Sequence, residues 1–148
     1  MAIGPRRRAR IVALQALFEA DTSNHEPMDS LQRIVQSQRT GKAPAAFAAE
    51  LVQAVLTNRE ELDLRIGKAA PAWPVDQLSA VDRNILRLAI SEMLGDNGTP
   101  VRAAINEAVE LAKAFGSEKS SSFVNGVLGS IAEELRQIEA DQPTAKRG

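Results

Sequence analysis

Apolar residues recur along this chain at intervals of three and four, which is the period of an α-helix that buries one face. One such stripe consists of Ile11, Leu14, Leu17 and Phe18. No segment shows the alternating pattern of a strand, and strand-favouring aromatic residues are few, with four Phe, one Trp and no Tyr. The sequence therefore predicts an all-α fold.

Start and stop signals divide the chain into six or seven expected helices. Pro5 suits the first turn of a helix, and Ser79 with Asp82 forms a capping-box pattern. Thr99 suits an N-cap, with Pro100 at the first helical position. The expected helical segments are 5–20, 29–38, 44–70, 81–94, 100–115 and 124–138.

A proline pair, Pro71 and Pro74, separates the expected helices into two groups, at about 5–70 and 75–140. A chain of 148 residues with 44% hydrophobic residues has the length and the core of one ordinary domain. We therefore expect two packed helical subdomains in a single compact bundle, 1–140. The polar residues 141–148 are expected to form a disordered tail.

Three glycines stand at positions that ask for a reason. Gly126 and Gly129 interrupt an apolar helical pattern, where glycine costs about 1 kcal/mol relative to alanine, so we expect a neighbouring helix to approach closely there, with the backbone of a ligand as the alternative. Gly116 follows Phe115 at the end of a helix, where glycine suits a left-handed cap.

The residues that catalysis and metal binding require are scarce. Cysteine is absent and His25 is the only histidine, in a polar stretch, which predicts no metal site and no cofactor. Glu107 and Glu110 are interpreted as solvating residues on one helix face. The chain has no apolar stretch of the roughly 20 residues that a membrane span needs and no signal-peptide pattern, so we expect a cytoplasmic protein without membrane contact. These features favour a binding protein over an enzyme.

The positive charge at the start of the chain is the strongest functional signal in the residues themselves. The net charge is −1, yet residues 1–10 contain four arginines and no acid. On a helix, Arg6, Arg7 and Arg10 fall within an arc of roughly 100°, whereas Arg8 points to the opposite side. Arginines are unfavourable at the positive end of a helix dipole, so the cluster is interpreted as a phosphate-binding site. A solvated, solubilising terminus is the alternative.

Three segments of the chain resemble the NusB transcription antitermination factor family. The first is 6–18, with the arginine cluster followed by Ala13-Leu14-Gln15-Ala16-Leu17-Phe18. The second contains Trp73, Asp76, Leu78, Val81-Asp82 and Ile85-Leu86-Arg87-Leu88-Ala89. The third and most specific runs from Ile105-Asn106-Glu107-Ala108 through Phe115-Gly116 to Phe123-Val124-Asn125-Gly126-Val127-Leu128.

The resemblance implies a NusB-like fold of two helical subdomains and a role without catalysis. It implies binding of a short single-stranded boxA-type RNA together with NusE, a small-subunit ribosomal protein, in the transcription elongation complex that makes ribosomal RNA. The residues that it assigns to RNA contact are Arg6, Arg7, Arg10, Gln15, Phe115, Gly116, Lys119, Ser120 and Phe123. Asp82 is the residue that it assigns to the protein partner.

Two other functions remain alternatives. Apolar helix faces serve folding and association alike, so a protein-only helical adaptor or a homodimer without RNA binding stays open. NusB-like domains also occur in RNA cytosine methyltransferases, but the residues after Leu128 are too few for a nucleotide-cofactor domain. We therefore expect no methyltransferase activity in this chain.

Overall fold

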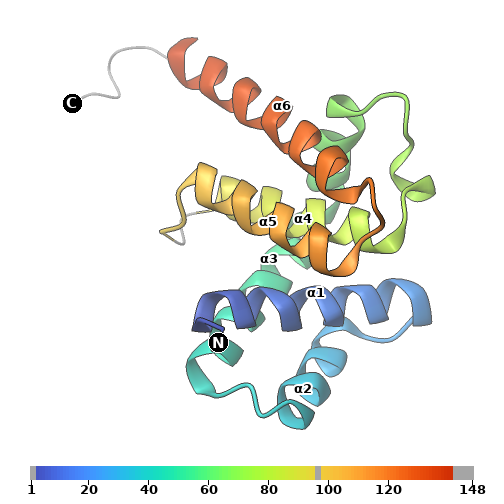
Figure 1. Ribbon diagram of the computed structural model, residues 1–148, viewed down its shortest axis with the longest axis vertical. Helices are drawn as coiled ribbons and strands as arrows, with labels where there is room; N and C mark the ends of the chain where they lie inside the picture. The colour runs from blue at the N-terminus through green and yellow to red at the C-terminus, as the bar shows by residue number, and fades with distance from the viewer. Residues whose placement is uncertain (1–2, 96–97, 142–148) are drawn as a thin grey trace.

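The computed structural model describes residues 3–95 and 98–141, and within them the chain forms six α-helices, one short 3-10 helix and no strand (Figure 1). The all-α prediction is confirmed. The elements are α1 Pro5–Ser23, α2 Pro27–Ser37, α3 Lys42–Ala69, η1 Val75–Gln77, α4 Ala80–Leu94, α5 Val101–Phe115 and α6 Ser120–Asp141. Asp141 ends α6, and the rest of the expected tail lies outside the described residues.

Local signals set most helix ends. Pro5 occupies the first turn of α1, and Asn24 ends that helix in the left-handed conformation, with φ 60°. At α4 the Ser79 hydroxyl accepts a hydrogen bond from the Asp82 amide, as the capping pattern predicts. The expected cap of α5 is wrong: Pro100 itself is the N-cap residue, and the Thr99 hydroxyl accepts a hydrogen bond from Arg6.

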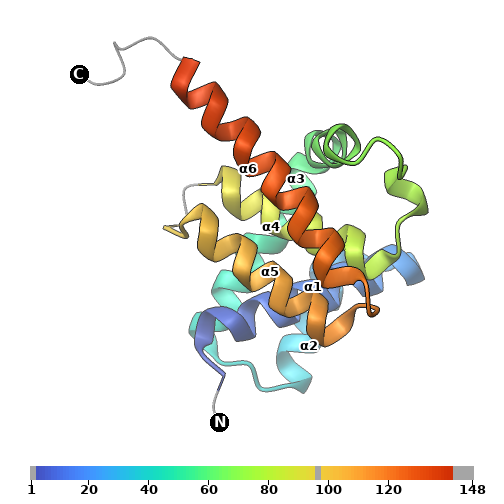
Figure 2. The same ribbon diagram turned by 45° about the horizontal axis from the view of Figure 1, so that its top comes forward.

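The helices form two groups, and α3 contacts helices of both (Figures 1 and 2). One group is α1 with α2 and α3, and the other is α4 with α5 and α6. The long α3 packs against α1, α2, α4 and α6, and it bends at Asn58, whose φ and ψ are −111° and 15°. The two groups contact each other mainly through α3 and α4.

Helix α4 is the centre of this bundle. Every residue from Asn84 to Met93 is buried, because α4 packs against α1, α3, α5 and α6. Its polar groups are paired with the first half of the chain: Arg83 and Asn84 donate to Asp21 at 2.9 Å, and Arg87 donates to Asp63 at 2.8 and 3.0 Å. The buried polar residues of α4 thus join the two helix groups.

The structure gives Gly126 and Gly129 no packing role. A Cβ atom built at either residue has no atom within 4 Å apart from the nearby backbone of its own helix, and both residues are exposed. The expected close approach of a neighbouring helix is therefore wrong. These two glycines lie on the outer face of α6, away from the apolar stripe that packs inward.

Candidate nucleic-acid interface

Helices α1 and α5 run in the same direction in Figure 1. Side-chain contacts join them at several levels. Arg6 of α1 donates to Thr99 just before α5, and Arg7 donates to Glu107 in the middle of α5. Further along, Leu14 and Phe115 line one groove. We call this line of contacts, from Arg6 to Phe115, the α1–α5 seam.

The first turn of α1 is the most positive part of the seam. Gly4 caps the helix without a side-chain hydrogen bond, and the first turn contains no acidic residue. Free backbone N–H groups and the helix dipole add to the charge of the arginines there. An anionic ligand therefore meets both amide donors and guanidinium groups at this end of α1.

Arg10 lies on the same side of α1 as Arg7, but it is buried against α4. Its side chain is only 6% exposed, and its guanidinium donates to both carboxylate oxygens of Glu92 in α4, at 2.7 and 2.8 Å. The fork of the Arg10 guanidinium is thus occupied by Glu92 in this structure, and contact of Arg10 with RNA stays a prediction. Arg10 fixes α1 onto α4.

Arg7 is half exposed and also paired. It donates to both oxygens of Glu107, at 3.0 and 2.9 Å, and the same carboxylate lies 3.8 Å from Arg10. The hydrogen bonds and charge of Arg7 lower the pKa of Glu107. Glu107 is therefore not the solvating residue that the sequence suggested, but the internal counterion of Arg7.

Arg6 rests on the ring of Phe47, a residue of α3 that is partly buried against the core. Its guanidinium carbon lies 4.2 Å from the centre of the Phe47 ring, within cation–π distance. The Arg6 side chain is exposed on its other side and also reaches Thr99. Phe47 is thus a positioning residue for Arg6, and helical periodicity could not distinguish this role from ordinary packing.

The second predicted contact region is the turn between α5 and α6. Lys119 is exposed, Phe115 is 41% exposed, and Phe123 is half-buried against the core. Ser120 is buried, and its hydroxyl accepts a hydrogen bond from the Ser117 amide at 2.9 Å. Lys119 and Phe115 are therefore available to a ligand, whereas the Ser120 side chain serves the turn.

Gly116 is required by close packing and not by a left-handed backbone. Its φ and ψ are −93° and −171°, which is extended, so the expected left-handed cap is wrong. A Cβ atom at this position would lie 2.5 Å from the Cβ of Ser120 and 2.8 Å from the Ala112 carbonyl oxygen. Only glycine lets the start of α6 approach the end of α5 so closely.

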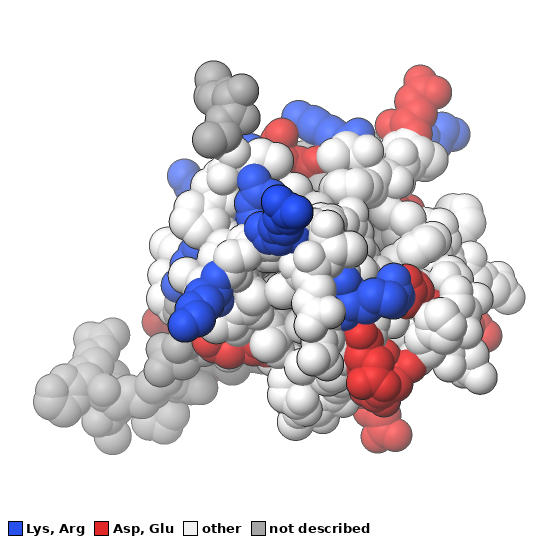
Figure 3. Space-filling view, turned by 90° about the horizontal axis from the view of Figure 1, so that it is seen from below, with Lys and Arg blue, Asp and Glu red and all other residues white. Residues whose placement is uncertain are grey.

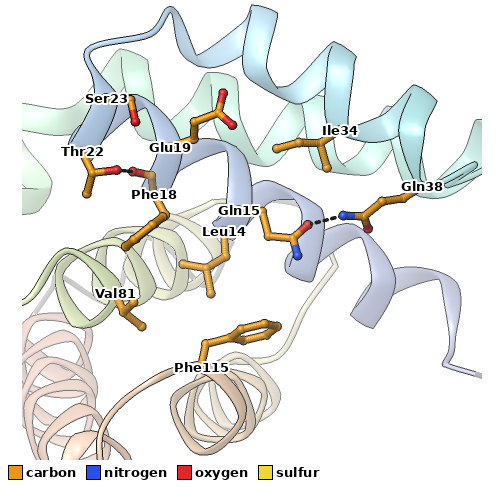
Figure 4. A pocket seen from close by; sticks show the side chains of 10 residues that line it. All are labelled: Leu14, Gln15, Phe18, Glu19, Thr22, Ser23, Ile34, Gln38, Val81 and Phe115. Atoms are coloured by element: carbon orange, nitrogen blue, oxygen red, sulfur yellow. Dashed lines mark hydrogen bonds between the residues drawn. The ribbon is translucent and has the colours of Figure 1, made fainter.

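A groove of about 560 Å³ continues the seam past Phe115 (Figure 4). Its lining is mainly apolar, with Gln15 on the α1 side, where Gln15 accepts a hydrogen bond from Gln38 at 2.9 Å. The residues that line it are Leu14, Gln15, Phe18, Glu19, Thr22, Ser23, Ile34, Gln38, Val81 and Phe115. Two predicted RNA contacts, Gln15 and Phe115, are thus brought together.

Asp82 lies next to Val81, at the start of α4 beside this groove. It is half-buried, and its Oδ1 atom is buried without a hydrogen-bond partner among the described residues. This oxygen is covered by the protein itself, so a partner would meet only the exposed part of the half-buried side chain.

Other kinds of site find no support in the part of the chain that the structure describes. No group of three His, Asp or Glu residues in residues 3–95 and 98–141 could hold a metal ion. None of the described helices is both long and apolar enough to cross a bilayer. The fold and the seam together define an all-α binding protein with an arginine-bearing surface for an anionic ligand.

The chain belongs to the NusB family, whose model matches residues 7–133. It is 46% identical, over 143 residues, to the transcription antitermination protein NusB of Heliobacterium modesticaldum, covering 97% of this chain and 69% of the relative.

Two solved structures have the same fold. NusB of T. maritima has a TM-score of 0.82 at 34% identity, covering 90% of this chain and 94% of that one. A NusB chain in a crystal structure of the antitermination factors NusB and NusE with dsRNA has a TM-score of 0.80 at 29% identity, covering 88% and 97%.

Proposed function

We propose that this protein is an RNA-binding transcription antitermination factor that binds boxA-type RNA together with NusE. The observation that carries the proposal is the α1–α5 seam, which joins the arginines of α1 to Phe115 and the α5–α6 turn along one line. A related chain was solved with NusE and dsRNA, which supports both kinds of partner. The protein acts in the cytoplasm as part of the elongation complex, and its role is binding without catalysis.

The residues proposed to contact RNA differ in how exposed their side chains are. Arg6 and Arg7 carry the accessible charge on α1, and Lys119 adds a cation at the other end of the seam. Phe115 presents an exposed ring on which a base can stack, a contact worth roughly 1–3 kcal/mol per base. Arg10 and Ser120 support these residues from the interior, and Gln15, Gly116 and Phe123 shape the surface between them.

NusE is proposed to use the groove beside Asp82. Phe18 is 40% exposed there, and Val81 and Ile34 add apolar surface. Protein interfaces draw most of their affinity from such apolar and aromatic anchors, with charged groups at the rim. A homodimer formed through the same groove is the competing use of this surface.

Fluorescence anisotropy with a boxA-type RNA, alone and with NusE, tests the RNA proposal. We expect weak binding alone, tighter binding with NusE, and weaker binding of a scrambled RNA in both conditions. Equal binding of the two RNAs in both conditions would overturn specific recognition.

Two charge-matched variants assign the binding to the seam. Arg6→Gln/Arg7→Gln should lower the magnitude of the log–log salt slope by about 1.4, since each phosphate on a single strand contributes about 0.7. Lys68→Gln/Arg136→Gln removes the same charge from highly exposed side chains on α3 and α6, and should leave the slope unchanged.

The Phe18→Gln variant tests whether NusE or a second copy of this chain occupies the groove. It should weaken NusE binding and leave binding of RNA alone unchanged, as measured by calorimetry and anisotropy. Light scattering of the protein alone reports the homodimer. A dimer that Phe18→Gln dissociates, without an effect on NusE, would favour the protein-only alternative.

A further inference from the structure

Acidic residues are missing from two separate segments of the chain. Residues 1–18 contain four arginines, and residues 30–49 contain Arg33, Arg39 and Lys42, with no Asp or Glu in either segment. The other 110 residues contain eleven basic and nineteen acidic residues. The positive charge of this acidic protein is therefore concentrated in two stretches.

The fold brings these two stretches together. Gln38, at the end of α2, donates a hydrogen bond to Gln15 in α1. A few residues later, Ala43 and Pro44 line a groove with Pro5 and Arg6, at the first turn of α1. The turn between α2 and α3 must therefore run along the flank of α1, from the level of Gln15 to the level of Arg6.

Three cations border this turn: Arg8 from α1, Arg39 from the turn itself, and Lys42 at the start of α3. We call them the α2–α3 basic surface. Arg8, which is partly exposed, shares a helix face with Gln15, seven residues later, and Gln15 contacts Gln38 where the turn begins. Among the described residues, no carboxylate lies within ion-pair distance of any of the three. Arg33 differs from them because it pairs with Glu19.

The start of α3 adds to the positive character of this surface. α3 begins at Lys42 with Gly41 as its N-cap, without a side-chain cap and without an acid in its first turn. Arg39 has a φ of 49°, in the left-handed region that a non-glycine residue rarely occupies. Figure 3, seen from below in the view of Figure 1, shows basic groups on this face, with acidic groups at several places around them.

The chemistry of the surface favours a polyanion over a protein. None of the large exposed hydrophobic residues of the described chain falls within 30–49, so the turn offers no apolar anchor of the kind that protein partners need. The exposed residues beside the cations are instead polar and neutral, including Gln36, Ser37 and Gln38. Cations with amide and hydroxyl groups are the usual contacts of a phosphate backbone.

We propose that the α2–α3 basic surface binds the phosphate backbone of RNA that extends beyond the α1–α5 seam. The inference rests on the proposed RNA-binding function. Arg6 belongs to the α1–α5 seam and also lines the groove with Ala43 and Pro44, so RNA held at the seam reaches this surface around the first turn of α1. The contacts are made to phosphates, so they lengthen the binding site without adding base specificity.

The test compares a short RNA that carries only the boxA-type motif with the same RNA extended by several nucleotides at either end. The wild-type protein with NusE should bind the extended RNA more tightly and with a steeper salt slope. Arg39→Asn/Lys42→Gln should lose this gain, lowering the slope for the extended RNA by about 1.4 for two single-strand phosphates, with little change for the short RNA. Asparagine is chosen because it tolerates the left-handed conformation at 39.

The Lys68→Gln/Arg136→Gln variant is the matched control and should keep the full gain. If Arg39→Asn/Lys42→Gln keeps it as well, with an unchanged circular dichroism melt, the inference is overturned. Weakened NusE binding with unchanged RNA binding would also overturn it, by assigning the surface to a protein. Absence of RNA binding by the wild-type protein in every condition would instead contradict the proposed function itself.

Discussion

Arg10 of α1 and Glu92 of α4 form a bidentate ion pair whose side chains are 6% and 2% exposed. The two residues are 82 positions apart, and their contact fixes the arginine-bearing end of α1 onto the central helix. Two forked hydrogen bonds satisfy most of the polar atoms that burial removes from water. The pair therefore sets the position of the neighbouring, accessible Arg6 and Arg7.

Removing one partner of this pair should be costly. Glu92→Gln removes the bidentate counterion of the buried Arg10 and leaves only the Glu107 carboxylate, 3.8 Å away, so the free energy of unfolding should fall by up to about 3–5 kcal/mol. Urea unfolding followed by circular dichroism measures the change. The double variant Arg10→Met/Glu92→Leu removes both charges and should recover most of the loss. If the double variant is no more stable than Glu92→Gln, unpaired charge is not the cause.

Arg7 and Glu107 give a prediction about affinity. Glu107→Gln keeps a hydrogen-bond acceptor beside Arg7 but removes the negative charge that an incoming phosphate would face. RNA affinity should rise roughly threefold to tenfold, as expected for about 1 kcal/mol between a carboxylate and a nearby phosphate at a protein surface. Anisotropy titrations at low salt measure the change.

Glu110→Gln provides the control for this prediction, because it removes the same charge one turn further along α5, where Glu110 pairs with Lys113. Its effect should be clearly smaller than that of Glu107→Gln. An Arg7→Gln background should also abolish most of the gain. Weaker RNA binding by Glu107→Gln would show that Glu107 orients Arg7 for RNA instead of opposing it.

These two pairs show where sequence reasoning succeeded and where it stopped. Periodicity and capping signals are local, so they placed the starts of α1 and α4 within one residue. The helical arc placed Arg7 and Arg10 on one side of α1 for the same reason. It could not identify Glu92 or Glu107 as their partners, because those residues come from helices that only the tertiary fold brings to α1. The burial of Arg10 could not be predicted for the same reason.

The three glycines show the same limit of prediction from sequence. The sequence predicted a special role for Gly126 and Gly129 from their apolar context, yet the structure gives them open space. It predicted a left-handed backbone for Gly116, whereas the structure shows a steric requirement. A glycine in the sequence shows only that a side chain is absent. The reason depends on the neighbouring atoms in the fold.

Gly116 and Gly126 form a matched pair for substitution by alanine. At Gly116 the added methyl group would meet Ser120 and the Ala112 carbonyl, and the resulting overpacking should cost about 1–3 kcal/mol. At Gly126, in open space on a helix, alanine should stabilise the protein by up to about 1 kcal/mol. Thermal melts compare the two variants. Gly116→Ala/Ser120→Gly should recover part of the loss, and equal melts for all three variants would contradict the steric reason.

Glu19 makes the contact between α1 and α2 sensitive to acid. Its carboxylate accepts hydrogen bonds from Ser30, at 2.6 Å, from Arg33 and from His25, and these contacts lower its pKa from 4.5 to about 2. A carboxyl group with a lowered pKa in the folded state stabilises the fold above its unfolded pKa, and this contribution disappears as the pH falls through the folded value.

The stability that Glu19 contributes should therefore be complete above about pH 5 and should decline between about pH 4.5 and 2. Urea midpoints measured across this range should fall less steeply for Glu19→Gln than for the wild-type protein. Glu50→Gln is the control, because Glu50 is an exposed carboxylate on α3. Parallel pH profiles for the wild-type protein and Glu19→Gln would show that the α1–α2 contact does not depend on this charge.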